Sequence, residues 1–569
     1  MSRRTLTSAI GLLVLVSVVL AGCAQATPTE APPVATEAPA PAVTEAPPEI
    51  PFEPMASLTA PSCDYGGIVK EVKAIDRLTV EFDLCVPDPV FPQKVAFSVF
   101  AIFPSEWLAS TVGAPERLEK PIGTGPYIVD QWVRGESITF KRFPDYWGEP
   151  GIADTIVFRW TSEAAARLLE LQAGTVDGID NPNPTDLEVI AADPTLQLMP
   201  RPGFNVFYMG MTNTFKPWDD VRVRQAVAMG IDRQRILDTF YPVGSEVATH
   251  FTPCSVPNGC VGEPWYDFDP VAAKALLADA GFADGFKTKL YYRDVVRSYL
   301  PQVNQVAEEI QSQLKTNLGI DAEIVKMESG TFLDESAAGN LDGIHLLGWN
   351  GDYPSVTNFL DYHFGQSQAQ FGTPYPEIYE NLVAGAQMAD PAESEAIYTA
   401  ANNAVRELVP MVPIAHGSSG VAYRADVTGA HASPLGNEYF AVTDPGGRDT
   451  FVWMQGGEPS SLFCADETDG EALRACEQAL EALFSYEVGG TEVQPALAEG
   501  CEPNADATVY TCTLRDGVKF HDGTDFDAND VVATFTMGLD AASAMHVGSS
   551  SAFEYYATLW VALMNVPPQ

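Results

Sequence analysis

Apolar and polar residues follow two different periods along most of this chain. Between residues 301 and 318, Val306, Ile310 and Leu314 recur at the spacing that places them on one face of a helix. From 320 to 325 the period shortens to two, as in a strand with one buried face. By the same criteria helices are expected over 221–237, 269–280 and 301–318, and strands over 79–84, 137–142 and 320–325. The pattern predicts a mixed α/β protein.

The first fifty residues follow another pattern. Arg3 and Arg4 precede an apolar run over 10–20 that is too short to cross a membrane, and Leu-Ala-Gly then leads into Cys23. This layout resembles the signal and lipobox of bacterial lipoproteins. The resemblance implies that 1–22 is a removed signal peptide and that lipidated Cys23 anchors the chain to a membrane; an ordinary secretory signal is the alternative. Residues 23–50, rich in Pro, Thr, Glu and Ala, are expected to form an extended tether.

Composition narrows the class of protein further. The 569 residues leave room for about three or four domains. Acidic residues number 76 against 32 basic ones, which makes the formal net charge −44. Such a charge disfavours binding to nucleic acid. The hydrophobic fraction of 46% excludes a chain that is disordered throughout.

The cysteines indicate an oxidising compartment. Once Cys23 is assigned to lipid, eight remain, and outside the cytoplasm an even set is typical of disulfides. They fall as four near neighbours, so the simplest pairing is Cys63–Cys85, Cys254–Cys260, Cys464–Cys476 and Cys501–Cys512. Short spacing favours this pairing and leaves the other connectivities open.

Motifs for catalysis or cofactor binding are missing from the sequence. Its seven histidines have no zinc-ligand spacing, and no phosphate-binding loop, dinucleotide motif or nucleophile elbow occurs. We therefore expect no metal, no cofactor and no enzymatic activity. A hydrolase without a recognisable motif stays open.

Several segments together resemble one family. They are Pro121–Tyr127, Phe143–Gly148, Asn213–Val227 and Leu514–Thr524. In combination they are similar to the extracellular substrate-binding proteins of peptide-importing ABC transporters, solute-binding family 5. The resemblance covers nearly everything after the tether. It implies an α/β fold of the type II periplasmic-binding-protein kind, with two large lobes, a hinge and cleft, and a small accessory domain.

The order of these segments differs from that of the family. There the block that matches Leu514–Thr524 stands near the N-terminus, whereas here it follows all the others. The resemblance therefore implies a circular permutation, joined through the turn at 445–449; a gene-assembly error is the alternative. The expected parts are lobe I, 121–225 plus 425–480; lobe II, 226–424; and the accessory domain, 51–120 plus 481–569.

The resemblance also nominates ligand-binding residues. In peptide-binding members, the Asp of a Trp-x-x-Asp motif grips the ammonium of the peptide, which points to Asp352 here. Trp349 and Tyr353 flank it, and Trp453 and Glu458 lie on a segment that faces the cleft in the family. A capping role for Asp352 and a core-packing role for the aromatic residues are the alternatives.

The sequence thus predicts a monomeric, lipid-anchored receptor outside the cytoplasm. It would capture a peptide and deliver it to the permease of an ABC importer, without contacting nucleic acid. A receptor for oligosaccharides or another small solute is the nearest alternative. A nickel receptor is disfavoured because the histidines form no cluster, and a surface enzyme or an adhesin lacks supporting motifs or repeats.

Overall fold

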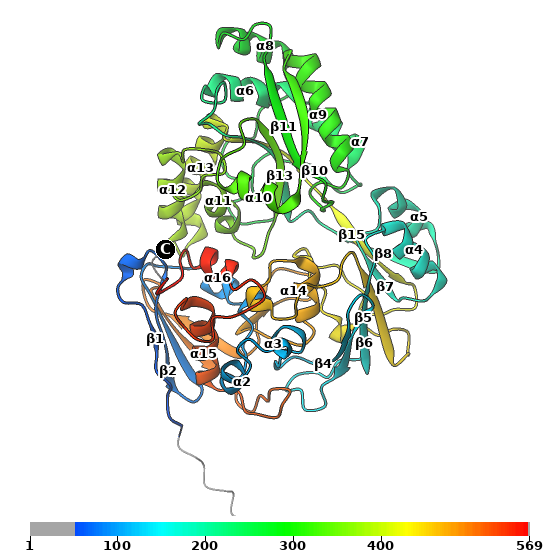
Figure 1. Ribbon diagram of the computed structural model, residues 1–569, viewed down its shortest axis with the longest axis vertical. Coiled ribbons are helices and arrows are strands. Elements are labelled where there is room, and N and C mark those ends of the chain that lie inside the picture. The colour runs from blue at the N-terminus through cyan, green and yellow to red at the C-terminus, as the bar shows by residue number, and fades with distance from the viewer. Residues whose placement is uncertain (1–51, 567–569) are drawn as a thin grey trace, which may run out of the picture. The chain divides into compact units, whose positions relative to one another are not determined.

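The computed structural model describes residues 52–566 (Figure 1). The predicted signal peptide, lipidated Cys23 and tether lie outside the described residues. Within 52–566, no helix combines the length and apolar character needed to cross a membrane. Sheets of five, seven and six strands organise these residues, together with a ribbon of β17 (Phe484–Tyr486) and β18 (Val493–Pro495).

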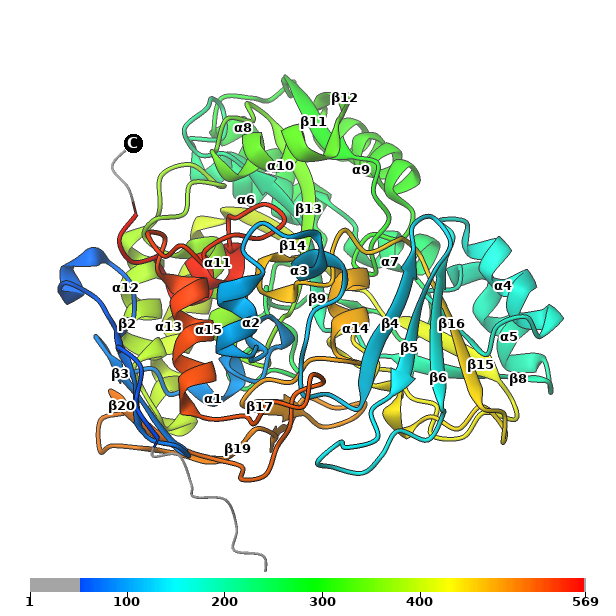
Figure 2. The same cartoon turned by 60° about the horizontal axis from the view of Figure 1, so that its bottom comes forward.

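The five-stranded sheet combines the beginning and the end of the described chain. Its order is β1 (Leu58–Thr59), β2 (Val69–Asp76), β3 (Thr79–Leu84), β20 (Val509–Leu514) and β19 (Ala498–Pro503), all antiparallel. Helix α15 (Ala528–Leu539) packs against β2, and Figure 2 shows it beside α2 (Ser105–Ser110). The backbone N–H of Ile68 donates to the carbonyl of Trp560 at 3.0 Å. Segments distant in sequence therefore build this part together.

A late strand lies in the middle of the seven-stranded sheet. The order is β4 (Tyr127–Val133), β5 (Ser137–Arg142), β6 (Thr155–Trp160), β16 (Thr450–Gln455), β7 (Gly178–Asp180), β15 (Ser419–Arg424) and β8 (Leu196–Arg201). Strand β16 runs parallel to β6 and β7, with Thr450 opposite Thr155 (Figure 2). The strand expected at 450–454 thus pairs with strands that follow Gly125, and 447–566 is not a detached domain.

The six-stranded sheet forms the second large lobe. Its order is β10 (Glu246–Val247), β14 (Met411–His416), β9 (Asn205–Met211), β13 (Ile344–Asn350), β11 (Lys287–Arg293) and β12 (Asp321–Met327). A separate apolar core holds it against its helices. We call this part lobe II, and the part with the seven-stranded sheet lobe I.

The chain crosses between the sheets of lobe I and lobe II at two places. It passes from β8 to β9 through 202–204 and returns from β14 to β15 through 417–418. The lobe boundaries expected at 225–226 and 424–425 do not coincide with these crossings. Strand β9 is buried along its whole length between β13 and β14, whereas β15 pairs with β7 and β8. Pairing partners, which local periodicity does not reveal, decide which sheet a strand joins.

Most predicted elements are present with nearly the expected bounds. Helices α9 (Val303–Leu318) and α8 (Pro270–Asp279) and strands β3, β5 and β12 confirm the pattern. The single helix expected over 221–237 is wrong, because the structure has α6 (Val221–Gly230) and α7 (Arg233–Phe240). The Asp232 carboxylate caps α7 by accepting the N–H of Arg235 at 3.0 Å, which ends one helix and starts the next.

The remaining helices cover these sheets. They are α1 (Phe91–Lys94), α3 (Pro115–Glu119), α4 (Ala164–Ala173), α5 (Leu187–Ala192), α10 (Ser329–Ala337), α11 (Val356–Phe364), α12 (Pro376–Ala386), α13 (Pro391–Leu408), α14 (Gly470–Cys476) and α16 (Glu554–Leu559). Helices α11 and α16 matter most for the site, because they carry its polar contacts.

All four expected disulfides are present in the structure. They join Cys63–Cys85, Cys254–Cys260, Cys464–Cys476 and Cys501–Cys512. Cys501 and Cys512 lie opposite each other on β19 and β20, so this bond ties a strand pair that already exists.

Candidate functional site

The loop between β13 and α11 carries three of the predicted ligand residues. Strand β13 ends at Asn350, and α11 begins after Ser355, whose hydroxyl oxygen accepts the N–H of Thr357. The intervening turn is held by Asn358, which is 1% exposed. Its Oδ1 accepts the backbone N–H of Asp352 at 2.9 Å and the indole N–H of Trp349 at 3.2 Å. One buried amide therefore fixes both residues.

The Asp352 carboxylate is bound by two neutral donors from different parts of the chain. The amide of Asn358 donates to Oδ2 at 3.0 Å, and the hydroxyl of Tyr555 on α16 donates to Oδ1 at 2.8 Å. Burial raises the pKa of Asp352 to about 6, against the lowering effect of these two hydrogen bonds, and the charge of Glu554 raises it further. Each carboxylate oxygen can accept a further donor.

The two aromatic neighbours of Asp352 occupy different environments. The Trp349 ring stacks on Tyr362 with centroids 4.0 Å apart and is half-buried. Tyr353 is 2% exposed, packs into the core shared by lobe I and the five-stranded sheet, and its hydroxyl lies 3.0 Å from that of Thr357. The loop from lobe II thus reaches the core of its neighbours.

Trp453 and Glu458 are placed away from these contacts. Trp453 is fully buried on β16, its ring packed against Phe440 at 4.8 Å. Glu458 accepts the indole N–H of Trp132 at 3.0 Å and the backbone N–H of Gly135 at 3.1 Å, at the β4–β5 turn. Their described partners are structural ones, and a role for either residue in ligand binding stays a prediction.

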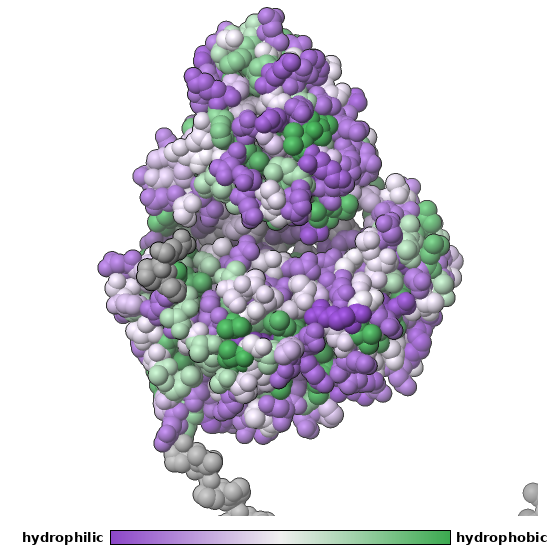
Figure 3. Space-filling view, viewed as in Figure 1, coloured by the Kyte–Doolittle hydropathy of each residue, from purple (hydrophilic) through white to green (hydrophobic). Residues whose placement is uncertain are grey.

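A large pocket is lined by residues from lobe I and from the segment that contains β17 and β18. It has a volume of about 890 Å³, including space open to solvent, and is lined by parts of 96–98, 146–147, 433–439 and 477–496. Figure 3 shows the surface hollowed between lobe II and the parts that carry α14 and α16.

Two contacts connect this pocket with Asp352. Ala96 and Ser98 line the pocket, and the ring of Phe97 between them packs edge-on against Tyr555 at 4.9 Å. Tyr486, also in the pocket wall, has a pKa far above its ordinary value because of burial and the charges of Tyr353, Asp352 and Glu477. The described lining of the pocket includes neither Asp352 nor another predicted ligand residue, so the carboxylate and the pocket are neighbours connected through Phe97 and Tyr555.

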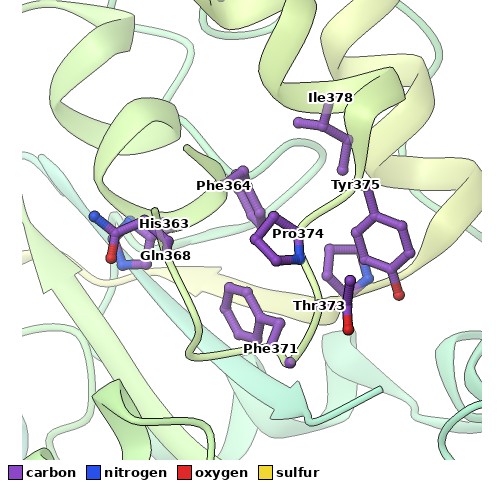
Figure 4. Close-up of a pocket in the computed structure, with 10 residues that line it drawn as sticks. His363, Phe364, Gln368, Phe371, Thr373, Pro374, Tyr375 and Ile378 are labelled. Atoms are coloured by element: carbon purple, nitrogen blue, oxygen red, sulfur yellow. The ribbon is translucent and has the colours of Figure 1, made fainter. Parts of the chain in front are cut away.

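A second, smaller pocket lies inside lobe II. It has about 240 Å³, including open space, and Figure 4 shows it beside α11 and α12 with Phe364, Phe371 and Ile378 in its walls. The His363 ring reaches its edge, and His363 Nδ1 lies 2.7 Å from the carbonyl of Phe359. These are core residues of lobe II, and none of the predicted ligand residues lines this pocket.

The chain forms two α/β lobes and connects them twice, and the loop after β13 of lobe II carries a polar site. This arrangement is typical of two-lobed periplasmic binding proteins. The sequence profile described as bacterial extracellular solute-binding proteins, family 5 Middle, matches residues 40–371 and 492–559. The chain belongs to this family, whose members are binding proteins.

Relatives and solved structures agree with this assignment. The dipeptide-binding protein of Escherichia coli is 31% identical over 381 residues, which cover 66% of this chain and 71% of that protein. Heme-binding protein A of Haemophilus influenzae is 28% identical over 382 residues, covering 66% and 69%. The dipeptide-binding protein of Pseudoalteromonas sp. SM9913 in complex with Met-Leu matches with a TM-score of 0.58 and 25% identity, over 65% of this chain and 74% of that one.

Sequence reasoning missed three polar residues of the site. Asn358 could have been identified from the sequence, because it lies in the first turn of a helix that follows the motif. Tyr555 and Glu477 carry none, since Tyr555 is 203 residues from Asp352 and reaches it only through tertiary packing.

Proposed function

We propose that this chain is the extracytoplasmic receptor of an ABC importer and captures peptides between its two lobes. The observation that carries the proposal is Asp352. Its carboxylate is bound by two neutral donors, has a raised pKa, and forms no ion pair among the described residues. The ammonium of a peptide would supply the missing positive charge. Relatives named as dipeptide-binding proteins support the same ligand class.

The chain acts by binding and release, and no bond is broken. The connections at 202–204 and 417–418 are the places where lobe II can rotate against lobe I. Closure would bury the ligand beside Trp349 and Tyr353, and the closed form would be recognised by the permease. Cys23 would hold the receptor at the membrane through lipid, a role supported by the lipobox-like sequence before it.

The segment order is proposed to be a circular permutation of the family's order. Three observations support it: β16 lies between β6 and β7, β19 and β20 extend the sheet of β2 and β3, and relatives align over only about two thirds of this chain. An alignment in chain order would cover about this share of the chain if 447–569 is displaced from its place in the family, because only the part between the tether and residue 447 can then be matched.

The ammonium role of Asp352 is tested with Asp352→Asn in the full chain. Titration calorimetry with trialanine is expected to show a loss of affinity of about 10- to 100-fold, because a charge-assisted bond becomes a neutral one. N-acetyl-trialanine, which lacks the ammonium, should bind the wild type as weakly as trialanine binds the variant.

The matched control is Asp334→Asn, which removes an exposed carboxylate from α10 in the same lobe. It should bind trialanine like the wild type. Native mass spectrometry of the purified wild type identifies any copurified solute, and sugars in place of peptides would contradict the proposal. Equal affinity for the free and the acetylated peptide would contradict the role of Asp352.

A further inference from the structure

The large pocket is acidic. Glu477, Glu481 and Glu487 line it, and none of its described lining residues is a lysine, an arginine or a histidine. Buried carboxylates are costly unless a donor or a cation compensates them. The hydrogen bonds and charges around Glu477 and Glu481 therefore indicate which of these two carboxylates can bind a charged group of the solute.

The protein donates three hydrogen bonds to the Glu481 carboxylate. It accepts hydrogen bonds from Thr124 Oγ1 at 2.7 Å, the Tyr146 hydroxyl at 2.7 Å and the Trp147 indole at 2.8 Å. Burial raises the pKa of Glu481, although these three hydrogen bonds and the charge of Arg515, whose guanidinium lies 4.3 Å from the centre of the Trp147 ring, lower it. Glu481 thus holds the aromatic wall of the pocket in place.

Glu477 has fewer partners. The Asn437 amide donates to its Oε1 at 2.9 Å. Ser98, 5% exposed in the pocket wall, lies close enough to lower the pKa of Glu477, yet its hydroxyl oxygen has no partner of hydrogen-bonding geometry within 52–566. Burial raises the pKa of Glu477 to about 7, against the lowering effects of Asn437, Ser98 and the charge of Arg474, and the charge of Glu438 raises it further. The carboxylate and the hydroxyl can both bind a further polar group.

The surroundings of Glu477 suit a long side chain that ends in a charge. Tyr439, Phe484 and Tyr486 supply apolar walls, against which an alkyl stem can pack and an ammonium or guanidinium can lie over a ring. Tyr486 is near enough to both Asp352 and Glu477 to feel their charges. A solute that contacts Asp352 would reach Glu477 past the Tyr486 ring.

We infer that the pocket around Glu477 receives a second positive charge of the solute, so that the receptor prefers peptides with a lysine or arginine side chain. The inference rests on the proposed peptide-binding function and names the class of peptide within it. The formal net charge of −44 also favours the approach of cationic peptides.

The test compares Ala-Lys-Ala with Ala-norleucine-Ala, which has a side chain of similar length and no charge. Titration calorimetry on the full chain is expected to give at least about tenfold tighter binding of the lysine peptide. In Glu477→Gln this preference should fall to about twofold, with affinity for the norleucine peptide unchanged. The matched control is Glu492→Gln, which removes an exposed glutamate next to β18 and should keep the full preference.

The outcomes separate the two proposals. If neither tripeptide binds the wild type, the peptide-binding function is wrong and this inference falls with it. If both bind equally, or if the preference survives in Glu477→Gln, only the inference is overturned. The comparison of the two peptides on the wild type decides the matter even if the variant fails to fold.

Discussion

Asp361 on α11 is a buried carboxylate outside the proposed ligand contacts. Its Oδ1 has no hydrogen-bond partner among the described residues, and it faces Lys94 and Asp88, which form a buried ion pair of 2.7 Å. Burial, together with the charge of Asp88, raises the pKa of Asp361 to about 8, although the charge of Lys94 lowers it. Lys94 pairs with Asp88 and does not offset the burial of Asp361, so the protonated form of Asp361 is favoured in the folded protein.

Asp361→Asn is expected to stabilise the protein by about 1–3 kcal/mol at pH 8. The folded state binds the Asp361 proton with a pKa of about 8, and the unfolded chain with one near 3.8. The wild type therefore loses stability from this group as the pH rises from about 4 to 8, and the advantage of the variant grows over the same window. Urea unfolding at pH 5 and pH 8 measures both values.

The exposed Asp334→Asn serves again as control and should change stability by less than about 0.5 kcal/mol at either pH. A variant at Asp361 that is less stable than the wild type at pH 8 would show that Lys94 compensates both carboxylates.

Among single residues, Asp352 could be predicted from the sequence because a short motif surrounds it. The sequence could not predict the raised pKa of Asp361 or Glu477, since both depend on how many atoms from distant segments exclude water. Trp453 and Tyr353, which were expected at the ligand, are each buried in a core, and their role in binding stays a prediction. Large aromatic residues suit either environment, so residue type does not distinguish between them.

Four buried charges join several elements of lobe I. Arg201 at the end of β8 and Arg474 on α14 both bind Glu438, at 2.5 Å and 2.7 Å. Both also bind Asp180 on β7, at 3.0 Å and 3.2 Å. Arg201 directly precedes the connection into lobe II at 202–204. The network therefore stabilises the position from which one of the two connections between the lobes starts.

Glu438→Gln is expected to lower the free energy of unfolding by about 3–5 kcal/mol, because it leaves two buried guanidinium groups with a single carboxylate between them. Urea unfolding at neutral pH measures the loss. Glu492→Gln removes the same charge from an exposed position and should cost less than about 0.5 kcal/mol. A loss below about 1 kcal/mol at Glu438 would mean that Asp180 alone satisfies both arginines.

Elements with a strong period or a clear cap were predictable. Strands β3 and β5 have the predicted bounds, and helix α9 repeats its apolar residues over four turns. The break between α6 and α7 was not foreseen, because the apolar spacing continues across Asp232. There the side-chain cap decides the structure locally.

For the whole molecule, the order of segments can be tested by restoring it. A chain in which 447–569 precedes 52–446, with a Gly/Ser linker of about ten residues at the new join, is expected to fold with the same four disulfides. The new ends fall at Gly446 and Gly447, a turn in which both residues have positive φ. The contacts Ile68–Trp560 and Met55–Asn529 already hold the segments to be joined in the same part.

The reordered chain should bind Ala-Lys-Ala within about threefold of the original and unfold within about 1–2 kcal/mol of it. Disulfide mapping, calorimetry and urea unfolding supply the three readouts. Failure to form the native disulfides would argue against permutation.

The sequence alone was enough to predict the family, most helices and strands and the motif of Asp352, and it favoured the pairing of cysteines close in the chain. Each of these depends on residues within a short stretch. Three features emerge from the tertiary structure alone: β9 joins lobe II, Tyr555 donates a hydrogen bond to Asp352, and Glu477 lines a pocket. These features depend on which distant segments pack together and exclude water, and no local period or motif records that.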